Sequence, residues 1–430
     1  MSKIKPEQLV SIDQAMQLIK KGGTVVTAMA AAEPQLFFSN LESFSENMQG
    51  RLRIYCANPS KRYAAFDCVN WQDKLEFIVM FLTRPVRQGD VPPHIQYLPH
   101  HLSQWSKMMA FRQDIDVFWG TCSLPDERGF VSLGTGSCYE PEILRQAKHV
   151  VLEINPHMPR TNGSTLVSLN EVNYFLEVDR DLPTIPRPAM SAIDHQIAEY
   201  VASLVPDEAT IQLGIGSIPN AIGEALSQKR HLGVHTEMIN DTMMDLYLKG
   251  VVTGKCKTRW PRKMIGAFAY GTKELYQFLD RNPVVELHPA SVVNDSFRIG
   301  LNHRMLSVNS AVEIDLTGQV CSESLGHMEL SGIGGANETH IGAQRCAEGR
   351  GIVALPSTTR DGLQSKIVFE LRPGAKVSIS RNDIDTVVTE HGIAQLKGKT
   401  VRERVLALID LAAPQFREKL IFQARKEKYL

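Results

Sequence analysis

The sequence predicts an α/β protein built from two related open α/β domains. Short strand-like runs such as TVVTAM, HVVLEI, TIQLGI and GIVALP alternate with longer amphipathic stretches, which is typical of parallel sheets covered by helices. The order of these runs in the first half of the chain returns in the second half. A chain of 430 residues also exceeds one ordinary hydrophobic core. Ligands of such domains bind at the carboxyl ends of the strands.

An internal repeat organises the chain. Residues 22–41 align without a gap with residues 207–226, and each segment has a strand-like run, a small-residue turn, a proline and a helix. Three further pairs follow in the same order: 128–136 with 317–326, 148–160 with 350–360, and 168–177 with 380–390. The proline-rich stretch DLPTIPRPAM (181–190) separates the halves. We therefore predict an N-terminal domain over residues 1–185 and a C-terminal domain over residues 186–430.

The composition restricts the class of partner. Lys plus Arg and Asp plus Glu number 47 each, so the basic surface of a nucleic-acid-binding protein is missing. The apolar runs are too short for a membrane span, and the first residues are typical of an amphipathic helix rather than a secretion signal. The seven scattered cysteines form no CxxC pair, so neither a disulfide framework nor a metal site is expected. We expect a cytoplasmic homo-oligomer, by default a dimer, without nucleic-acid or membrane partners.

Glu237 has no acidic counterpart in the first half of the internal repeat. Aligning RLRIYCAN (51–58) with HLGVHTEM (231–238) places Ala57 opposite Glu237, at the end of a strand-like run. A carboxylate there could cap the next helix, but Asp241 fits that structural role better. Because only one half of the repeat carries this acid, Glu237 is the candidate catalytic residue, and it belongs to the C-terminal domain.

Two glycine-rich turns in the second half could bring backbone N–H groups to a ligand. The first follows a strand-like run as Gly214-Ile215-Gly216 and opens a helix. Its distance from Glu237 also fits a dinucleotide fingerprint, but Pro219 replaces the third glycine, so a dehydrogenase is a minor alternative. The second turn, SGIGG (331–335), is suited to a phosphate or an oxyanion, or it is simply a tight loop.

Several dispersed motifs resemble the acetyl-CoA hydrolase/transferase family. They are GIGSIPNAI (214–222), HTEM (235–238), AFAYGTKELYQFLDRNP (267–283), VNSAVEIDLTGQV (308–320), SGIGG (331–335), ALPST (354–358) and VVTEHGIAQLKGKTVRERVLALIDLAAP (387–414). GFVSLGTG (129–136) and EINPHMPRTNG (153–163) extend the resemblance to the first half. The likeness is closest to the 4-hydroxybutyrate and butyrate CoA-transferase branch. It implies two related open α/β domains with the active site at their interface.

The resemblance also implies roles for residues of this sequence. Glu237, in the HTEM motif, would be the nucleophile that carries coenzyme A (CoA) as a glutamyl-CoA thioester. The CoA- and oxyanion-binding positions would be Gln212, Leu213, Gly214, Ile215, Gly216, Gly334, Gly335, Lys366 and Asn309, with Lys366 meeting a phosphate or carbonyl of CoA. After SGIGG the family usually has a glutamine and an Asp-Phe pair. Here the segment 336–340 reads ANETH, which leaves the preferred acid open.

The implied reaction moves CoA from an acyl-CoA to a short-chain carboxylic acid, with 4-hydroxybutyrate or butyrate and acetate as the expected acids. A glutamate that is ionised at neutral pH needs no general base to attack a thioester. CoA would serve as substrate and transient covalent group, and no metal or permanently bound cofactor is expected. Hydrolysis of acyl-CoA through the same glutamate is the close alternative. A metabolite-binding regulator is a third possibility, although a regulator would not need Glu237.

Overall fold

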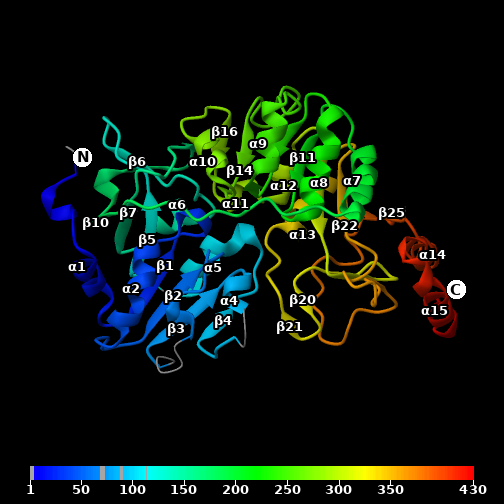
Figure 1. The fold of residues 1–430 in the computed structure, drawn as a ribbon, viewed down its shortest axis with the longest axis horizontal. Helices are drawn as coiled ribbons and strands as arrows, with labels where there is room; N and C mark the ends of the chain where they lie inside the picture. The colour runs from blue at the N-terminus through cyan, green and yellow to red at the C-terminus, as the bar shows by residue number, and fades with distance from the viewer. Residues whose placement is uncertain (1–3, 68–72, 88–90, 113) are drawn as a thin grey trace. The chain divides into compact units, whose positions relative to one another are not determined.

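The computed structural model of the protein describes residues 4–67, 73–87, 91–112 and 114–430 (Figure 1). The chain forms two compact units. Unit 1 comprises Met1–Pro186, Met238–Asn240 and Ile265–Val293, and unit 2 comprises Arg187–Glu237, Asp241–Met264 and Asn294–Leu430. The division at residue 185 stays a prediction.

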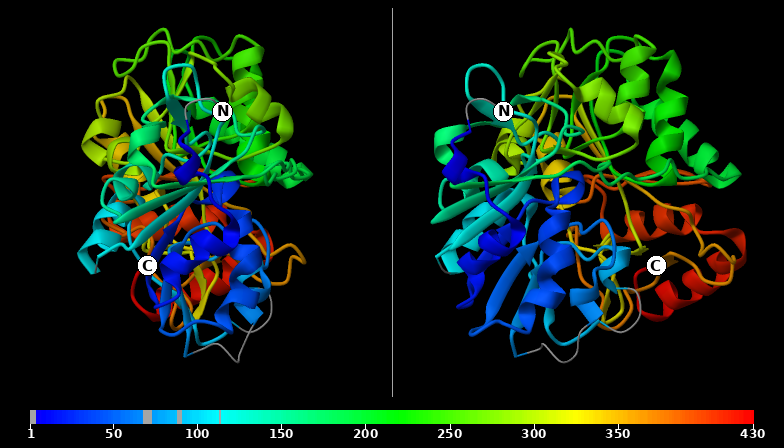
Figure 2. Two further views of the ribbon diagram at one scale, coloured as in Figure 1. Left: turned by 90° about the vertical axis from the view of Figure 1, so that its left-hand side faces the viewer. Right: turned by 60° about the vertical axis from the view of Figure 1, so that its left-hand side comes forward.

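Unit 1 is built on a seven-stranded parallel sheet of order β10-β7-β5-β1-β2-β3-β4 (Figure 1, Figure 2). Its strands are β1 (Gly23–Thr27), β2 (Leu52–Cys56), β3 (Leu75–Val79), β4 (Ile95–Tyr97), β5 (Val117–Cys122), β7 (His149–Ile154) and β10 (Tyr174–Glu177). The strand residues are mostly buried, as expected for a parallel sheet with helices on its faces. The strand order reverses at β1, which lies between β2 and β5.

Helices and short strand pairs complete unit 1. The helices are α1 (Ile12–Met16), α2 (Gln35–Ser45), α3 (Ala64–Asp67), α4 (Arg84–Arg87), α5 (Trp105–Arg112), α6 (Glu140–Leu144), α10 (Lys273–Leu279) and α11 (Ala290–Val293). The strand pairs are β6 (Phe130–Ser132) with β9 (Leu166–Ser168), β16 (Val285–Leu287) with β8 (Asn162–Gly163), and β13 (Met238–Ile239) with β15 (Phe268–Ala269). Phe37 and Leu41 of α2 pack into the same core as the sheet residues Val25, Ile54 and Trp119.

Unit 2 repeats this topology. Its sheet contains β25 (Gly392–Gln395), β24 (Thr386–Thr389), β22 (Arg350–Ala354), β17 (Met305–Ser310), β11 (Thr210–Leu213) and β12 (Gly233–His235), in that order. Only β25 is antiparallel to its neighbour in this series. The order β24-β22-β17-β11-β12 matches β10-β7-β5-β1-β2 of unit 1. The predicted α/β class with parallel sheets is confirmed.

The helices of unit 2 begin where the sequence provides caps. They are α7 (Ala192–Leu204), α8 (Ser217–Ala225), α9 (Asp241–Leu248), α12 (Ser296–Ile299), α13 (Ala336–Gln344), α14 (Val401–Leu411) and α15 (Pro414–Lys426). Ser191 and Thr400 start α7 and α14 with capping boxes, whereas α8 and α13 start at glycines. Short strands β18 (Glu313–Asp315), β19 (Val320–Cys321), β23 (Ile367–Val368), β20 (Ser324–Leu325) and β21 (Met328–Glu329) lie outside the main sheet, and β14 (Met264–Gly266) crosses the unit boundary.

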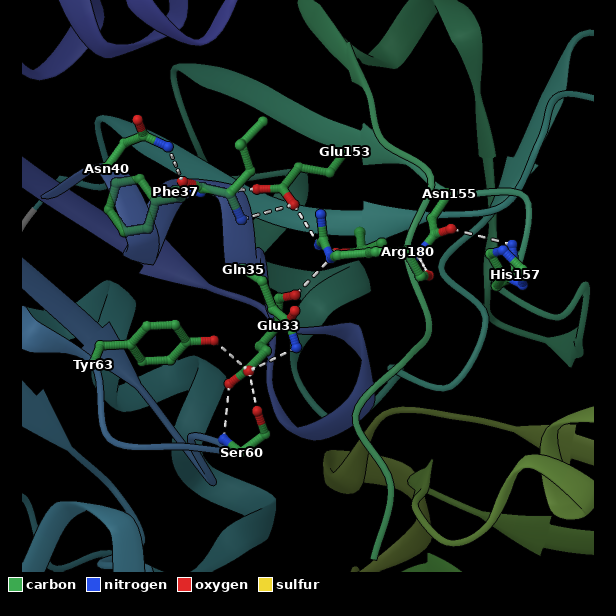
Figure 3. A network of polar contacts seen from close by, with 12 residues as sticks. Glu33, Gln35, Phe37, Asn40, Ser60, Tyr63, Glu153, Asn155, His157 and Arg180 are labelled. Atoms are coloured by element: carbon green, nitrogen blue, oxygen red, sulfur yellow. Dashed lines mark hydrogen bonds and ion pairs between the residues drawn. The ribbon is translucent and has the colours of Figure 1, made fainter.

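Two buried carboxylates brace the loops of unit 1 (Figure 3). Glu33 accepts hydrogen bonds from the Ser60 backbone N–H at 2.9 Å and from the Tyr63 hydroxyl at 2.5 Å. Glu153 pairs with Arg180 at 2.5 Å. Burial raises the pKa of both carboxyls, and these partners oppose the shift. The contacts tie the segments that follow β1 and β2 to each other, and β7 to the segment that follows β10, so we assign these acids to the scaffold.

Among the described residues, no helix is long and apolar enough to cross a membrane. The same ranges contain no group of three or more His, Cys, Asp or Glu side chains placed to hold a metal ion. No disulfide joins the six cysteines within the described part of the chain.

Candidate active site

The first glycine turn connects β11 to α8 at the point where the strand order of unit 2 reverses. The Gly214 N–H donates to the Val308 carbonyl at 3.0 Å, which holds the turn against β17. Gly216 caps α8 with φ +116°, a conformation that favours glycine, and no atom lies within 4 Å of the position a Cβ would take. Leu213 is buried and Ile215 is 56% exposed. The turn therefore presents open backbone at the carboxyl edge of the sheet, where α/β proteins bind ligands.

Glu237 lies two residues beyond β12, at the same edge of this sheet. The hydroxyl of Thr236 donates to the Leu213 carbonyl at 3.4 Å, which links the segment carrying Glu237 to the end of β11. Glu237 is only partly exposed, and protein atoms surround its carboxylate. One of its oxygens, Oε2, accepts a hydrogen bond from the Gly335 N–H at 2.8 Å. The candidate nucleophile is thus held by one backbone donor.

The second glycine turn supplies that donor from the start of α13. Gly334 has φ +53° and Gly335 caps the helix. A methyl group at Gly335 would overlap the Asn294 amide nitrogen and Glu237 Oε2, so a larger residue here would displace these side chains. The free N–H groups and the dipole of a helix start both favour negative charge. The turn therefore lies against the Glu237 carboxylate, and its role toward a phosphate or an oxyanion of a substrate stays a prediction.

Asn294 is the residue that the sequence analysis missed. It is fully buried, and its amide lies beside Gly335 and Glu237. The amide favours the ionised form of Glu237, yet no contact within the described residues has full hydrogen-bond geometry. A buried amide with spare hydrogen-bonding capacity beside a candidate nucleophile is available to a reacting group. In the sequence Asn294 precedes the helix-capping Asp295 and looks like an ordinary loop residue.

The remaining predicted positions fall into two groups. Gln212 of β11 and Asn309 of β17 are buried on adjacent strands and share a hydrogen bond of 3.3 Å. Lys366 directly precedes β23, and its backbone N–H donates to the Ser357 carbonyl at 2.8 Å. Burial lowers the pKa of the Lys366 ammonium group, and the nearby Glu390 carboxylate opposes this shift. No contact within the described ranges joins Lys366 to Glu237, so its role toward CoA stays a prediction.

The protonation state expected for Glu237 needs correction. Burial raises the pKa of its carboxyl from 4.5 to about 7, against the opposing effects of the Gly335 N–H and Asn294. Burial should therefore leave a larger share of Glu237 protonated near neutral pH in the free enzyme than is usual for a solvated glutamate. Poor solvation also favours the reaction, because a weakly hydrated carboxylate loses less hydration free energy when it attacks a carbonyl carbon.

This shift predicts a pH dependence. Only the ionised carboxylate can attack, so kcat/KM for acyl-CoA should rise with pH and level off above an apparent pKa of about 7. The measurement is kcat/KM between about pH 5.5 and pH 8.5, which reports groups of the free enzyme. A profile that is flat over this range would show that Glu237 titrates like an ordinary solvated glutamate.

Comparisons with known proteins match nearly the whole chain. Residues 4–186 match the acetyl-CoA hydrolase/transferase N-terminal domain, and residues 271–424 match the C-terminal domain of the same name. The chain is 36% identical to a 4-hydroxybutyrate coenzyme A transferase of Clostridium kluyveri, over 98% of each chain. It is 33% identical to a succinyl-CoA:cyclohexane-1-carboxylate CoA transferase of Geobacter metallireducens, over 98% of this chain and 95% of the relative.

A solved structure is also similar to this chain over its whole length. The crystal structure of RipA from Yersinia pestis superposes with a TM-score of 0.93 at 31% identity, covering 100% of this chain and 99% of that one. An acetyl-CoA hydrolase of Saccharomyces cerevisiae is more distant, at 22% identity over 94% of this chain and 85% of its own length.

Proposed function

The chain belongs to the acetyl-CoA hydrolase/transferase family and is an acyl-CoA:carboxylate CoA-transferase, and we propose that Glu237 performs the transfer through a glutamyl-CoA thioester. The observation that carries this proposal is the convergence of three groups: Glu237 Oε2, the Gly335 N–H at 2.8 Å and the buried Asn294 amide. This arrangement combines a nucleophile with donors that can stabilise charge on its own carbonyl oxygen.

The first step uses the two oxygens of Glu237 differently. Oε2 is held by Gly335, so Oε1 attacks the thioester carbonyl carbon of the acyl-CoA. The C–S bond breaks, the sulfur leaves as the CoA thiolate, and an acyl-glutamyl anhydride forms. A serine in place of Glu237 would form an ester too stable to pass CoA on.

In the second step the thiolate attacks the Glu237 side-chain carbonyl carbon. The tetrahedral intermediate places negative charge on Oε2, where the Gly335 N–H already lies and the Asn294 amide is adjacent. The C–O bond to Oε1 breaks, and Oε1 leaves with the first acid as its carboxylate. A second carboxylate then enters and the steps run in reverse, so the thioester energy is conserved without ATP.

The relatives support a proposal for the two acids. We propose 4-hydroxybutyrate or butyrate and acetate as the acid pair, because a 4-hydroxybutyrate coenzyme A transferase is 36% identical over 98% of both chains. Residues 212–216, with open backbone at Gly216, would line the thiol end of CoA, and Lys366 would approach a phosphate or carbonyl of CoA. An apolar pocket separates acids by about 1–3 kcal/mol per methylene, so neighbouring chain lengths should also react. A cytoplasmic dimer stays an expectation from the sequence.

Removing the Asn294 amide tests the oxyanion site. Asn294→Ala should lower kcat about 10²- to 10³-fold with little change in KM, because the amide acts mainly on the transition state. Asn302→Ala is the matched control, since Asn302 is also buried but donates to the Ile299 carbonyl instead. The measurement is kcat and KM for both variants by steady-state kinetics. If the Asn294→Ala enzyme has the kcat of the wild type, Asn294 has no role in the mechanism.

Acetate dependence separates transfer from hydrolysis. Butyryl-CoA is supplied with and without acetate, and free CoA thiol and acetyl-CoA are measured together. We expect acetyl-CoA to form with acetate and little thiol to appear without it, because water should resolve the glutamyl thioester slowly. Thiol release at the same rate with and without acetate, and no acetyl-CoA, would assign the protein to the hydrolases.

A further inference from the structure

A ring of buried polar side chains supports the candidate active site within unit 2. Gln212 lies on β11, Ser307 and Asn309 lie on β17, and Thr339 lies on α13. The four residues are 3%, 0%, 8% and 3% exposed. None of them carries a charge, and of the four only Gln212 and Asn309 belong to the predicted site.

The hydrogen bonds of this ring can all be satisfied at once. Ser307 Oγ donates to Gln212 Oε1 at 2.6 Å, and Gln212 Nε2 donates to Asn309 Oδ1 at 3.3 Å. Asn309 Nδ2 donates its two hydrogens to Ser307 Oγ at 3.0 Å and to Thr339 Oγ1 at 3.1 Å. Thr339 Oγ1 then donates to the Ala336 carbonyl at 3.2 Å. The side-chain hydrogen-bond donors of Ser307 and Asn309 therefore bond to other protein groups and are not available to a ligand.

The ring joins two backbone segments near Glu237, namely the start of α13, which donates to Glu237, and the end of β11, which accepts from Thr236. Ala336 is the first residue of α13 and directly follows Gly335, the donor to Glu237. At the other end, Gln212 lies two residues before Gly214, whose N–H donates to the carbonyl of Val308 on β17. The start of α13 and the end of β11 are thus both hydrogen-bonded to residues 307–309 of β17.

We propose that Ser307 and Thr339 are positioning residues, whose hydroxyls fix the start of α13 so that the Gly335 N–H points at Glu237. The inference rests on the proposed function, in which Glu237 is the nucleophile. A buried hydroxyl costs desolvation that an alanine or valine of similar shape would avoid. Closed polar networks of this kind enforce one orientation of the groups they join, and an error of about 1 Å in a reacting geometry can cost about a hundredfold in rate.

Substitutions at Thr339 test this role through kinetics. Thr339→Val keeps the shape and removes the hydroxyl, and we expect kcat to fall about 10- to 100-fold with KM changed by less than about threefold. The apparent pKa of kcat/KM should move upward, because a displaced Gly335 N–H no longer favours the ionised form of Glu237. Thr339→Ser restores the hydroxyl and should recover most of the rate, and Ser307→Ala should change kcat and pKa in the same direction as Thr339→Val. The four residues of the ring have no ionisable group, so a shift in pKa cannot come from the ring itself.

Thr389→Val is the matched control for a lost buried hydroxyl. Thr389 is fully buried on β24 and donates to the Leu411 carbonyl at 2.9 Å, outside the ring. We expect its Tm to fall while kcat and the pH profile stay those of the wild type. If the folded Thr339→Val or Ser307→Ala enzyme also keeps the wild-type kcat and pH profile, the positioning role is wrong. If the wild-type enzyme forms no CoA adduct on Glu237, the proposed function itself fails, and this result is independent of the Thr339 variants.

Discussion

Glu237→Gln should lower kcat for CoA transfer by on the order of 10⁴-fold or more, because an amide cannot form the acyl anhydride. Glu237→Asp keeps the carboxylate but moves it by about one methylene, and we expect a loss of roughly a hundredfold. The measurement is acetyl-CoA formation from butyryl-CoA and acetate for the three proteins. Equal rates for Glu237→Gln and the wild type would exclude Glu237 as the nucleophile.

Glu237→Gln also has a predicted effect on stability, which separates a loss of catalysis from a loss of folded protein. The folded pKa of Glu237 lies near 7 and the unfolded value near 4.5, so the folded state binds more protons between these values. Its contribution to the free energy of unfolding therefore falls as pH rises from about 4.5 to about 7 and stays low above that. Glu237→Gln removes this penalty, and at pH 8 its Tm should exceed that of the wild type by roughly 2–4 °C. A lower Tm would argue that the carboxylate stabilises the fold.

Gly335→Ala should be about as damaging as Asn294→Ala. Its φ of −99° suits alanine, so the damage comes only from the new methyl group, which would overlap Asn294 Nδ2 and Glu237 Oε2. Either α13 or the Glu237 side chain must move, which separates the donor from the nucleophile. We expect kcat/KM to fall about 10²- to 10³-fold, the cost of losing one oxyanion donor.

Gly342→Ala on the same helix is the control. A Cβ at Gly342 would lie 2.8 Å from the Ile299 side chain, so this variant crowds the contact between α13 and α12 without touching Glu237. It should lower Tm and leave kcat/KM close to the wild-type value. Equal losses of kcat/KM in the two variants would show that α13 tolerates no added methyl group anywhere, and that Gly335 has no special role.

The fold and the main candidate were predictable from local patterns. Strand-like runs with glycine and proline turns fix parallel strands, and their recurrence predicts the matching strand orders around β1 and β11. The repeat also isolated Glu237, because Ala57 occupies the corresponding position. The glycines at 214, 216, 334 and 335 are visible in the sequence. Gly216 and Gly334 have positive φ, and an added methyl group at Gly335 would overlap Asn294 and Glu237.

Other parts of the site were not predictable because they depend on packing between distant segments. Asn294 looks like a loop residue until the fold places its amide beside Gly335. The raised pKa of Glu237 comes from burial, which a strand-end position does not specify. Ser307 and Thr339 look like ordinary strand and helix residues. Their role depends on the register that places Ser307 opposite Gln212, and on the packing of α13 against β17.

The most direct test of the account is the intact mass of the protein after brief exposure to butyryl-CoA, followed by peptide mapping of the wild type and of Glu237→Gln. We predict a mass gain of one CoA less one water, located on the peptide that contains Glu237 and absent from Glu237→Gln. Addition of acetate should remove the adduct and release acetyl-CoA. Transfer activity without any adduct, or an adduct on a different residue, would contradict the proposed mechanism.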